Sequence, residues 1–233
     1  MNYSIYTVIT FCLVIASAKA QDFDTILKAA TDKYITSEVY QIDADYNLYA
    51  DSDSDSLIDQ QKSIFIKRQN ALYFKMAQSE LIQTEAFSLK ISHSEQILLY
   101  SKSYGSQSPS SQLPYMDLER NFSTKTIKDK GTYWECLMTD NTSISIPYRK
   151  IILHIEKGDY KILKQVYFLN RASSKNVGYA AITGNERLEI VTKSFTTSPK
   201  DITQKFELSR YLDIKDNTLT SSNYTKNYKI IVQ

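Results

Sequence analysis

Residues 40–50 have the sequence YQIDADYNLYA. Apolar or aromatic residues occupy every second position from Tyr40 to Ala50, and most residues between them are polar. Successive side chains of a strand point to opposite faces, so this alternation predicts a long strand with one buried face. A polar loop is expected at residues 51–60, after which the chain can turn back along this strand.

The rest of the chain predicts more strands at hairpin spacing. They are expected at residues 63–68, 72–77, 86–92, 95–101, 132–138, 148–155, 160–170, 187–195 and 228–232, with a charged turn at 156–159. The composition agrees, because 5 Gly and 4 Pro are low counts while 18 Tyr and 9 Phe favour strands. Consecutive strands at short spacing predict a wide antiparallel sheet that curls to protect its edges.

One amphipathic helix is expected before the first strand. Phe23, Ile26, Leu27, Ala30 and Tyr34 follow helical spacing. The predicted fold is therefore α+β and mainly β: a half-barrel whose N-terminal helix packs on the concave face of the sheet. Residues 101–130 are rich in serine, can hold a short helix at 116–122, and could form a lid or a mobile loop.

Residues 1–20 have the pattern of a cleavable signal peptide. An apolar stretch at 5–16 is followed by Ala18-Lys19-Ala20, which predicts cleavage near Ala20. A retained membrane anchor is the alternative, but the stretch is shorter than the roughly 20 residues of a membrane span. Residues 21–233 are expected to form a single domain located in the periplasm or secreted.

Charge and cysteine content reduce the number of possible functions and stabilising bonds. Cleavage removes Lys19 and no acidic residue, so the formal charge of +2 becomes +1 and gives no reason to expect a nucleic acid partner. Only Cys136 remains after cleavage, which excludes an intramolecular disulfide. A lone cysteine between Trp134 and Met138 is predicted to be a buried apolar residue rather than a nucleophile.

Metal and catalytic motifs are weak. The run at residues 51–56 alternates Asp and Ser as in a calcium loop, but its sixth residue is Ser56 and its twelfth is Lys62, where such a loop needs Gly and Glu. A solvated acidic loop is the preferred interpretation. His93 and His154 do not have the spacing of metal ligands, and the common hydrolase and nucleotide motifs do not occur. We therefore expect no enzyme activity, no metal and no cofactor.

Several segments together resemble the periplasmic lipoprotein-carrier family, the LolA-like half-barrels. These are the signal peptide, the helix and the long strand that follows it, the segments 73–76, 87–91 and 96–100, and the hairpin of 150–155 with 160–168. The resemblance implies an incomplete barrel around an apolar cavity that takes the acyl chains of lipoproteins. It also implies a role in lipoprotein transport and outer-membrane biogenesis.

The first hypothesis is thus a non-catalytic, monomeric periplasmic protein that binds an acyl chain or a lipoprotein. The candidate ligand-binding residues are apolar positions of the helix and strands: Phe23, Leu27, Ile42, Tyr46, Leu48, Phe74, Met76, Phe87, Leu89 and Ile91. The alternative is an exported structural or assembly module without a lipid cavity. Its protein partner, which could be membrane-associated, would dock on a sheet edge or on the Ser-rich segment.

Overall fold

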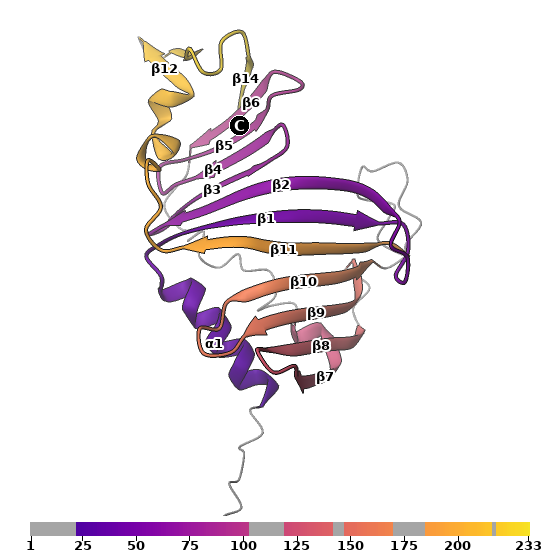
Figure 1. Ribbon diagram of the computed structural model, residues 1–233. Helices are drawn as coiled ribbons and strands as arrows, with labels where there is room; N and C mark the ends of the chain where they lie inside the picture. Colours follow the sequence, from indigo (N-terminus) through magenta and orange to yellow (C-terminus); the bar gives the residue numbers. More distant parts are fainter. Residues whose placement is uncertain (1–21, 103–118, 142–146, 170–184, 216–217) are drawn as a thin grey trace, which may run out of the picture.

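The computed structural model describes residues 22–102, 119–141, 147–169, 185–215 and 218–233. These residues form one α-helix, fourteen strands and short 3₁₀ turns (Figure 1). The predicted signal peptide lies outside the described residues.

The elements follow the chain from helix to strands. The helix is α1 (Phe23–Thr36), and the first six strands are β1 (Val39–Tyr49), β2 (Leu57–Arg68), β3 (Ala71–Met76), β4 (Ser79–Gln83), β5 (Phe87–Ser92) and β6 (Ile97–Lys102). The next five are β7 (Phe122–Asp129), β8 (Tyr133–Asn141), β9 (Tyr148–Glu156), β10 (Ile162–Leu169) and β11 (Arg187–Thr196). The last three are β12 (Leu212–Lys215), β13 (Thr218–Ser221) and β14 (Lys229–Val232). The 3₁₀ turns are η2 (Glu119–Asn121), η3 (Thr203–Phe206) and η4 (Leu208–Arg210).

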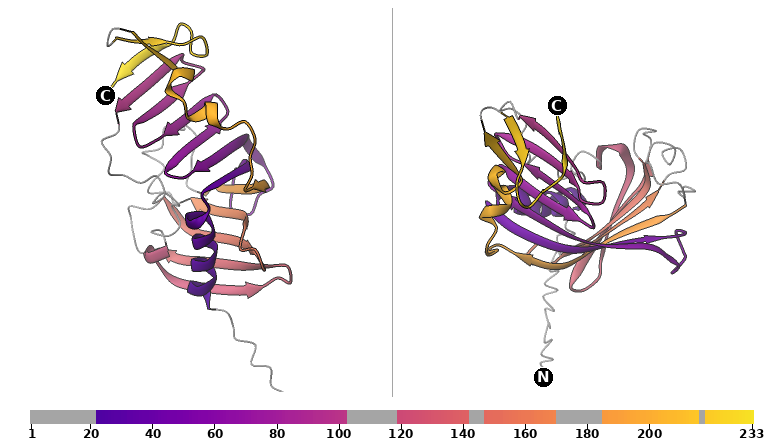
Figure 2. Two further views of the ribbon diagram at one scale, coloured as in Figure 1. Left: turned by 90° about the vertical axis from the view of Figure 1, so that its left-hand side faces the viewer. Right: turned by 90° about the horizontal axis from the view of Figure 1, so that it is seen from above.

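Twelve strands form one continuous sheet in the order β14-β6-β5-β4-β3-β2-β1-β11-β10-β9-β8-β7. Neighbouring strands are antiparallel, except that β14 runs parallel to β6. The pairing of β1 with β11 joins β2–β6 to β7–β10. The sheet curls but does not close, and its edge strands β14 and β7 remain apart (Figures 1 and 2). This confirms the predicted mainly β, curled antiparallel architecture.

Each face of the sheet carries its own core. Opposing residues of paired strands share a face, so the register can be followed from strand to strand. We call the face against which α1 packs the helix face. The opposite face is the tail face, because residues 202–215 and 218–230, the C-terminal segment, pack there. The helix covers the β7–β11 half of the sheet, and the C-terminal segment covers the β2–β6 half (Figure 2).

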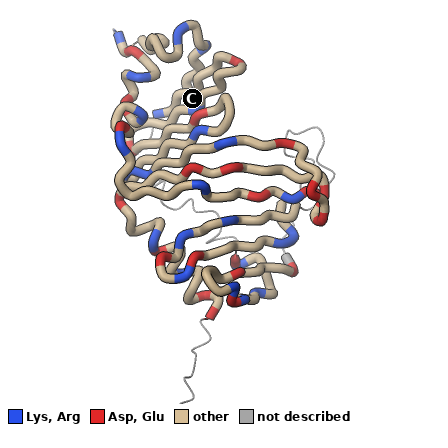
Figure 3. Tube along the Cα trace, in the orientation of Figure 1, with Lys and Arg blue, Asp and Glu red and all other residues tan. Residues whose placement is uncertain are grey.

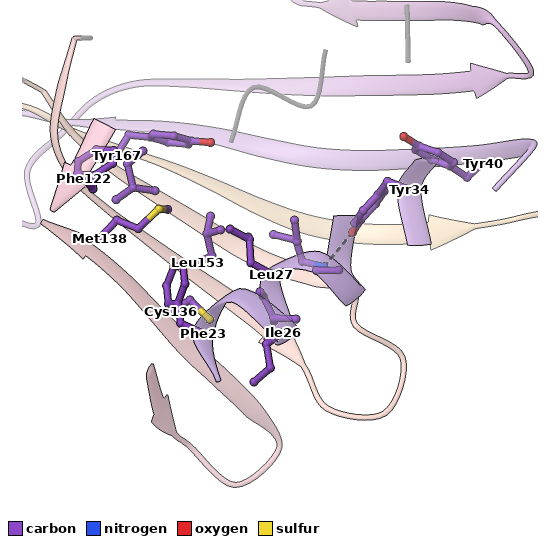
Figure 4. Close-up of a cluster of buried hydrophobic side chains, with 14 residues drawn as sticks. Phe23, Ile26, Leu27, Tyr34, Tyr40, Phe122, Cys136, Met138, Leu153 and Tyr167 are labelled. Atoms are coloured by element: carbon purple, nitrogen blue, oxygen red, sulfur yellow. Dashed lines mark hydrogen bonds between the residues drawn. The ribbon is translucent and has the colours of Figure 1, made fainter. Parts of the chain in front are cut away.

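The helix-face core joins α1 to strands β7–β10 (Figure 4). Phe23, Ile26 and Leu27 pack with Cys136 of β8 and Leu153 of β9. The helical spacing predicted from the sequence therefore buries a single stripe, as expected. The structure shows the helix against this face; whether this is the concave side of the sheet stays a prediction.

Lys67 of β2 fastens the end of the helix. Its buried ammonium group donates hydrogen bonds to the carbonyl oxygens of Tyr34 at 2.9 Å, Ile35 at 2.6 Å and Ser37 at 2.9 Å. The last carbonyl groups of a helix have no partner within the helix and carry a partial negative charge. Lys67 supplies both the donors and the positive charge, although burial lowers its pKa.

The sequence predicted the helix and the long strands, except for the start of β2, but missed several short strands. The strands β4, β7, β12 and β13 were not predicted, and β2 begins at Leu57 inside the expected polar loop. In β4, two adjacent apolar residues, Leu81 and Ile82, break the alternation that marks a strand. Of the expected loop at 101–130, residues 103–118 lie outside the described residues, and β7 occupies 122–129.

Replacing Lys67 with Met should lower the free energy of unfolding by about 1–3 kcal/mol, because three helix-end carbonyls lose a charged donor. Urea denaturation followed by circular dichroism measures this loss. Lys62→Met is the matched control, since Lys62 lies on the same strand and is exposed. Equal stability of the two variants would contradict the capping role.

Candidate ligand-binding groove

The structure divides the ten predicted ligand-binding residues between the two faces. Seven lie on the helix face: Phe23, Leu27, Ile42, Tyr46, Leu48, Phe74 and Met76. The other three, Phe87, Leu89 and Ile91, lie on the tail face, where they are buried under the C-terminal segment. Phe74 and Ile91, one from each group, nevertheless line the same groove.

Within the seven, the degree of burial differs. Phe23 and Leu27 are fully packed in the helix-face core, and Ile42 packs against it. Tyr46 of β1 and Phe74 of β3 lie farther along the sheet, with their rings in edge contact at 6.3 Å between centroids. Phe74 and Met76 are half-buried and belong to neither core.

A groove of about 330 Å³ continues from Phe74 across the helix face of β4, β5 and β6. The register places Phe74, Leu81, Lys90 and Leu99 in one row across four strands, all on this face. The residues lining the groove are Phe74, Ser79, Glu80, Leu81, Lys90, Ile91, Ser92, Glu95, Ile97 and Leu99. Leu81, Ile97 and Leu99 are half-buried and, like Phe74, lie outside both cores.

Sequence reasoning missed Leu81 and Leu99 as groove residues. Leu81 belongs to β4, which was not predicted, and Leu99 shares its strand with the buried Leu98 of the opposite face. The turn after β3 gives no sequence signal, because residues 77–78 are Ala-Gln rather than a typical hairpin pair. Only the structure shows the positive φ of 49° at Ala77 and the pairing of Leu81 with Phe74.

Behind the groove strands, on the tail face, Glu80 is the centre of a buried polar cluster. Its Oε1 accepts hydrogen bonds from the hydroxyl of Tyr224 at 2.6 Å and from the ammonium group of Lys75 at 3.0 Å, and lies 2.9 Å from Nε2 of His93. The other ring nitrogen of His93 is 2.7 Å from the hydroxyl of Tyr228. Glu80 thus ties the C-terminal segment to β4.

Opposing influences set the pKa of Glu80. Burial alone raises the pKa, but the hydrogen bonds from Tyr224, His93 and Lys75 outweigh it and hold the pKa below its usual value of 4.5. Glu80 is therefore a carboxylate in the folded protein near neutral pH. Its negative charge is compensated by the ammonium group of Lys75.

The remaining candidates from the sequence have structural roles. Cys136 is fully buried, and burial raises the pKa of its thiol to about 12, so it is protonated at neutral pH. This confirms the prediction of a buried apolar residue. Burial lowers the pKa of His154, whose ring stacks on Tyr133 with 4.6 Å between centroids. Among the described residues, no three His, Cys, Asp or Glu side chains are grouped to hold a metal ion.

The acidic loop at residues 51–56 caps the β1–β2 hairpin, where Figure 3 shows Asp and Glu gathered at the strand ends. Asp51, Asp53 and Asp55 are exposed. The guanidinium group of Arg187 donates hydrogen bonds to the carbonyl oxygens of Ser52 at 2.5 Å and Ser54 at 3.2 Å. The loop is held by its backbone, which agrees with a solvated acidic loop.

Comparisons with known proteins give matches in structure only. No protein-family model and no curated protein sequence matches this chain. An uncharacterized conserved protein from Thermus thermophilus shares 10% identity over 90% of this chain and 98% of its own, with a TM-score of 0.49. A LolA superfamily protein from Nitrosomonas europaea shares 11% identity over 77% of this chain and 96% of its own, with a TM-score of 0.33.

The matched structures include a putative outer membrane lipoprotein-sorting protein domain from Vibrio parahaemolyticus as well as this LolA superfamily protein. The MucA/MucB complex of Pseudomonas aeruginosa also matches, with 10% identity over 80% of this chain and 60% of the matched chain, and a TM-score of 0.43. At these identities the similarity concerns the arrangement of the elements and carries no information on ligand or partner. In the described part of the chain, the one α-helix is too short and too polar to cross a membrane.

Replacing Glu80 with Gln should lower the free energy of unfolding by roughly 1–3 kcal/mol near neutral pH, because the charge-assisted hydrogen bonds weaken. A carboxyl group with a lowered pKa in the folded state stabilises the protein above its unfolded pKa, and this contribution is lost as the pH falls. The difference between the wild type and the variant should therefore shrink below the usual pKa of 4.5. Denaturant unfolding at a series of pH values measures it.

Glu207→Gln provides the control for this experiment, because Glu207 is exposed on the same C-terminal segment. It should leave the stability and its pH dependence unchanged. A Glu80→Gln variant as stable as the wild type across this range would show that the charge of Glu80 does not fasten the segment.

Cys136 should resist thiol reagents in the folded protein and react on unfolding, because the thiol is buried and protonated. Ellman's reagent, added to native protein and to protein in urea, measures both rates. Rapid labelling of the native protein would reopen the thiol-enzyme interpretation.

Proposed function

We propose that this protein is a periplasmic, non-catalytic binding or carrier protein that holds an acyl chain or a similar apolar ligand in the groove on the helix face. The observation that carries this proposal is the row of Phe74, Leu81 and Leu99. These side chains point to the helix face, line a groove and belong to neither core. Apolar surface left outside the cores typically marks a binding site.

Removal of apolar ligand surface from water would drive binding. Each Å² contributes about 25 cal/mol before the ordering costs are deducted. Phe74, Leu81, Ile97 and Leu99 supply the apolar wall, and Tyr46 extends it toward the centre of the sheet. The predicted signal peptide and the resemblance to LolA-like carriers agree with a periplasmic site of action.

The helix has a supporting part in this proposal. Phe23 and Leu27 are packed in the helix-face core and do not line the groove, which lies on strands beyond β1. We propose that α1 closes the β7–β11 half of the helix face, so that the ligand is confined to the β3–β6 half. Lys67, at the border of the two halves, holds the end of the helix in this position.

A protein-binding module is the second candidate function. Leu57 and Ile58, at the start of β2, are 47% and 49% exposed beside the acidic loop. Exposed aliphatic side chains next to charged ones are found at protein interfaces. In that case a protein partner would contact the tip of the β1–β2 hairpin, and the groove would stay without a ligand.

Phe74→Ala should mainly reduce ligand binding, whereas Phe87→Ala should mainly reduce stability. Phe87 is buried in the tail-face core, so its truncation should cost about 3–5 kcal/mol of unfolding free energy. Phe74 is half-buried in the groove, so its truncation should cost less stability but reduce the lipid that co-purifies from the protein's own host. Urea denaturation and native mass spectrometry measure the two quantities.

Wild-type protein should carry heterogeneous lipid mass in this experiment, and Phe87→Ala should still carry it under conditions where the variant is folded. A Leu57→Ala variant serves as the control for the groove, because Leu57 lies at the hairpin tip. Wild-type protein without bound lipid, together with a co-purifying protein that Leu57→Ala releases, would favour the protein-binding module.

A further inference from the structure

The groove carries a positive charge among its apolar residues. Lys90 lies on β5 between Leu81 of β4 and Leu99 of β6, and its side chain shares their face. It lines the groove, is exposed, and forms no ion pair in the described part of the chain. A lysine in the centre of an apolar row is not explained by packing of the sheet.

A second lysine lies on the other side of β6. Lys229 of β14 pairs with Ile97 in parallel register, so its side chain also points to the helix face. Lys229 is exposed and, in the described residues, has no ion-pair partner. Lys90 and Lys229 thus stand on the two strands that flank β6, on either side of Ile97 and Leu99.

Among the described residues, no acidic side chain forms an ion pair with Lys90. The carboxylate of Glu80 is engaged on the tail face by Lys75, His93 and Tyr224. Glu95 is the other acidic residue of the groove, and it lies in the turn after β5, beyond the strand end. The hydroxyl group of Ser92, between Lys90 and this turn, accepts a hydrogen bond from the backbone N–H of Glu95 at 3.4 Å and lies 3.3 Å from the hydroxyl of Ser94.

The size of the groove limits the ligand. Its volume of about 330 Å³ is near the lower end of the roughly 300–1,000 Å³ of small-molecule sites in proteins. One acyl chain fits such a volume better than a lipid with two or three chains. The apolar row then matches the chain of a single-chain amphiphile, and the adjacent lysine matches its head group.

We propose that the groove selects a single-chain amphiphile with an anionic head group, whose chain lies along Phe74, Leu81 and Leu99 and whose head group contacts the ammonium group of Lys90. This inference rests on the proposed function, because it assigns a ligand class to the same groove. Lys229 adds a longer-range attraction, which salt screens beyond about 10 Å at 0.1 M.

The test uses the mature chain and a neutral fluorescent probe, N-phenyl-1-naphthylamine, which binds apolar sites. Hexadecanoate, hexadecanol and hexadecylamine, each below its aggregation concentration, compete with the probe. Hexadecanoate should displace it at a concentration about threefold lower than hexadecanol, as expected for an exposed ion pair, and hexadecylamine should be weakest. The preference should decrease at high salt.

Lys90→Met should remove the preference for hexadecanoate over hexadecanol, since Met keeps the apolar stem of lysine but lacks its charge. Lys128→Met is the matched control, because Lys128 is an exposed lysine on the tail face of β7, paired with Glu135 of β8. It should behave as the wild type. Circular dichroism and urea denaturation of each variant show that the fold is retained.

The outcomes separate the two proposals. Equal displacement by the carboxylate and the alcohol, a preference for the amine, or an unchanged preference in Lys90→Met would overturn the assignment of an anionic head group and leave the apolar groove in place. Failure of all three compounds to displace the probe, or failure of the probe itself to bind, would overturn the proposed function together with this inference.

Discussion

A β-strand sends successive side chains to opposite faces, and this constraint decides which residues of the protein can share a core. The apolar residues of β8 and β9 face α1, whereas those of β5 face the C-terminal segment on the other side of the same sheet. One sheet therefore supports two cores, one at each half. The helix face of the β3–β6 half and the tail face of the β7–β10 half are left outside both.

The groove is a consequence of this arrangement. Where the tail face of β4, β5 and β6 is filled by the core, their helix face carries a mixed row in which Leu81 and Leu99 surround Lys90. The C-terminal segment stabilises the wall of the groove from behind, and Glu80 joins the segment to that wall through Tyr224. The wall of the groove and the core that supports this wall are thus opposite sides of the same three strands.

Periodicity predicted the helix and the long strands well, because Phe23 to Tyr34 and Tyr40 to Leu48 repeat their patterns over many residues. Periodicity could not show which residues of different strands share a face of the sheet. Alternation separates the side chains of a strand into two sets, but it does not say which face each set lies on. Phe74 and Leu89 are grouped in the sequence analysis because each lies at an apolar position of a predicted strand. The unpredicted strand β4 lies between their strands. Phe74 pairs with Leu81 of β4 and Leu89 pairs with the adjacent Ile82, so Phe74 and Leu89 lie on opposite faces of the sheet. The ten candidate ligand-binding residues stay a prediction, and the groove is also lined by Leu81 and Leu99, which only the strand pairing reveals.

The pairing of β1 with β11 bears on how the chain folds. Gln41 lies opposite Thr196, so the contact that unites the two halves of the sheet closes a loop containing most of the chain. Contacts between such distant residues form slowly, because the entropy of closing the loop is lost before the contact stabilises the chain. Until β11 arrives, the unpaired side of β1 offers a long open edge to other strands. Aggregation of the incompletely folded chain would therefore begin at β1.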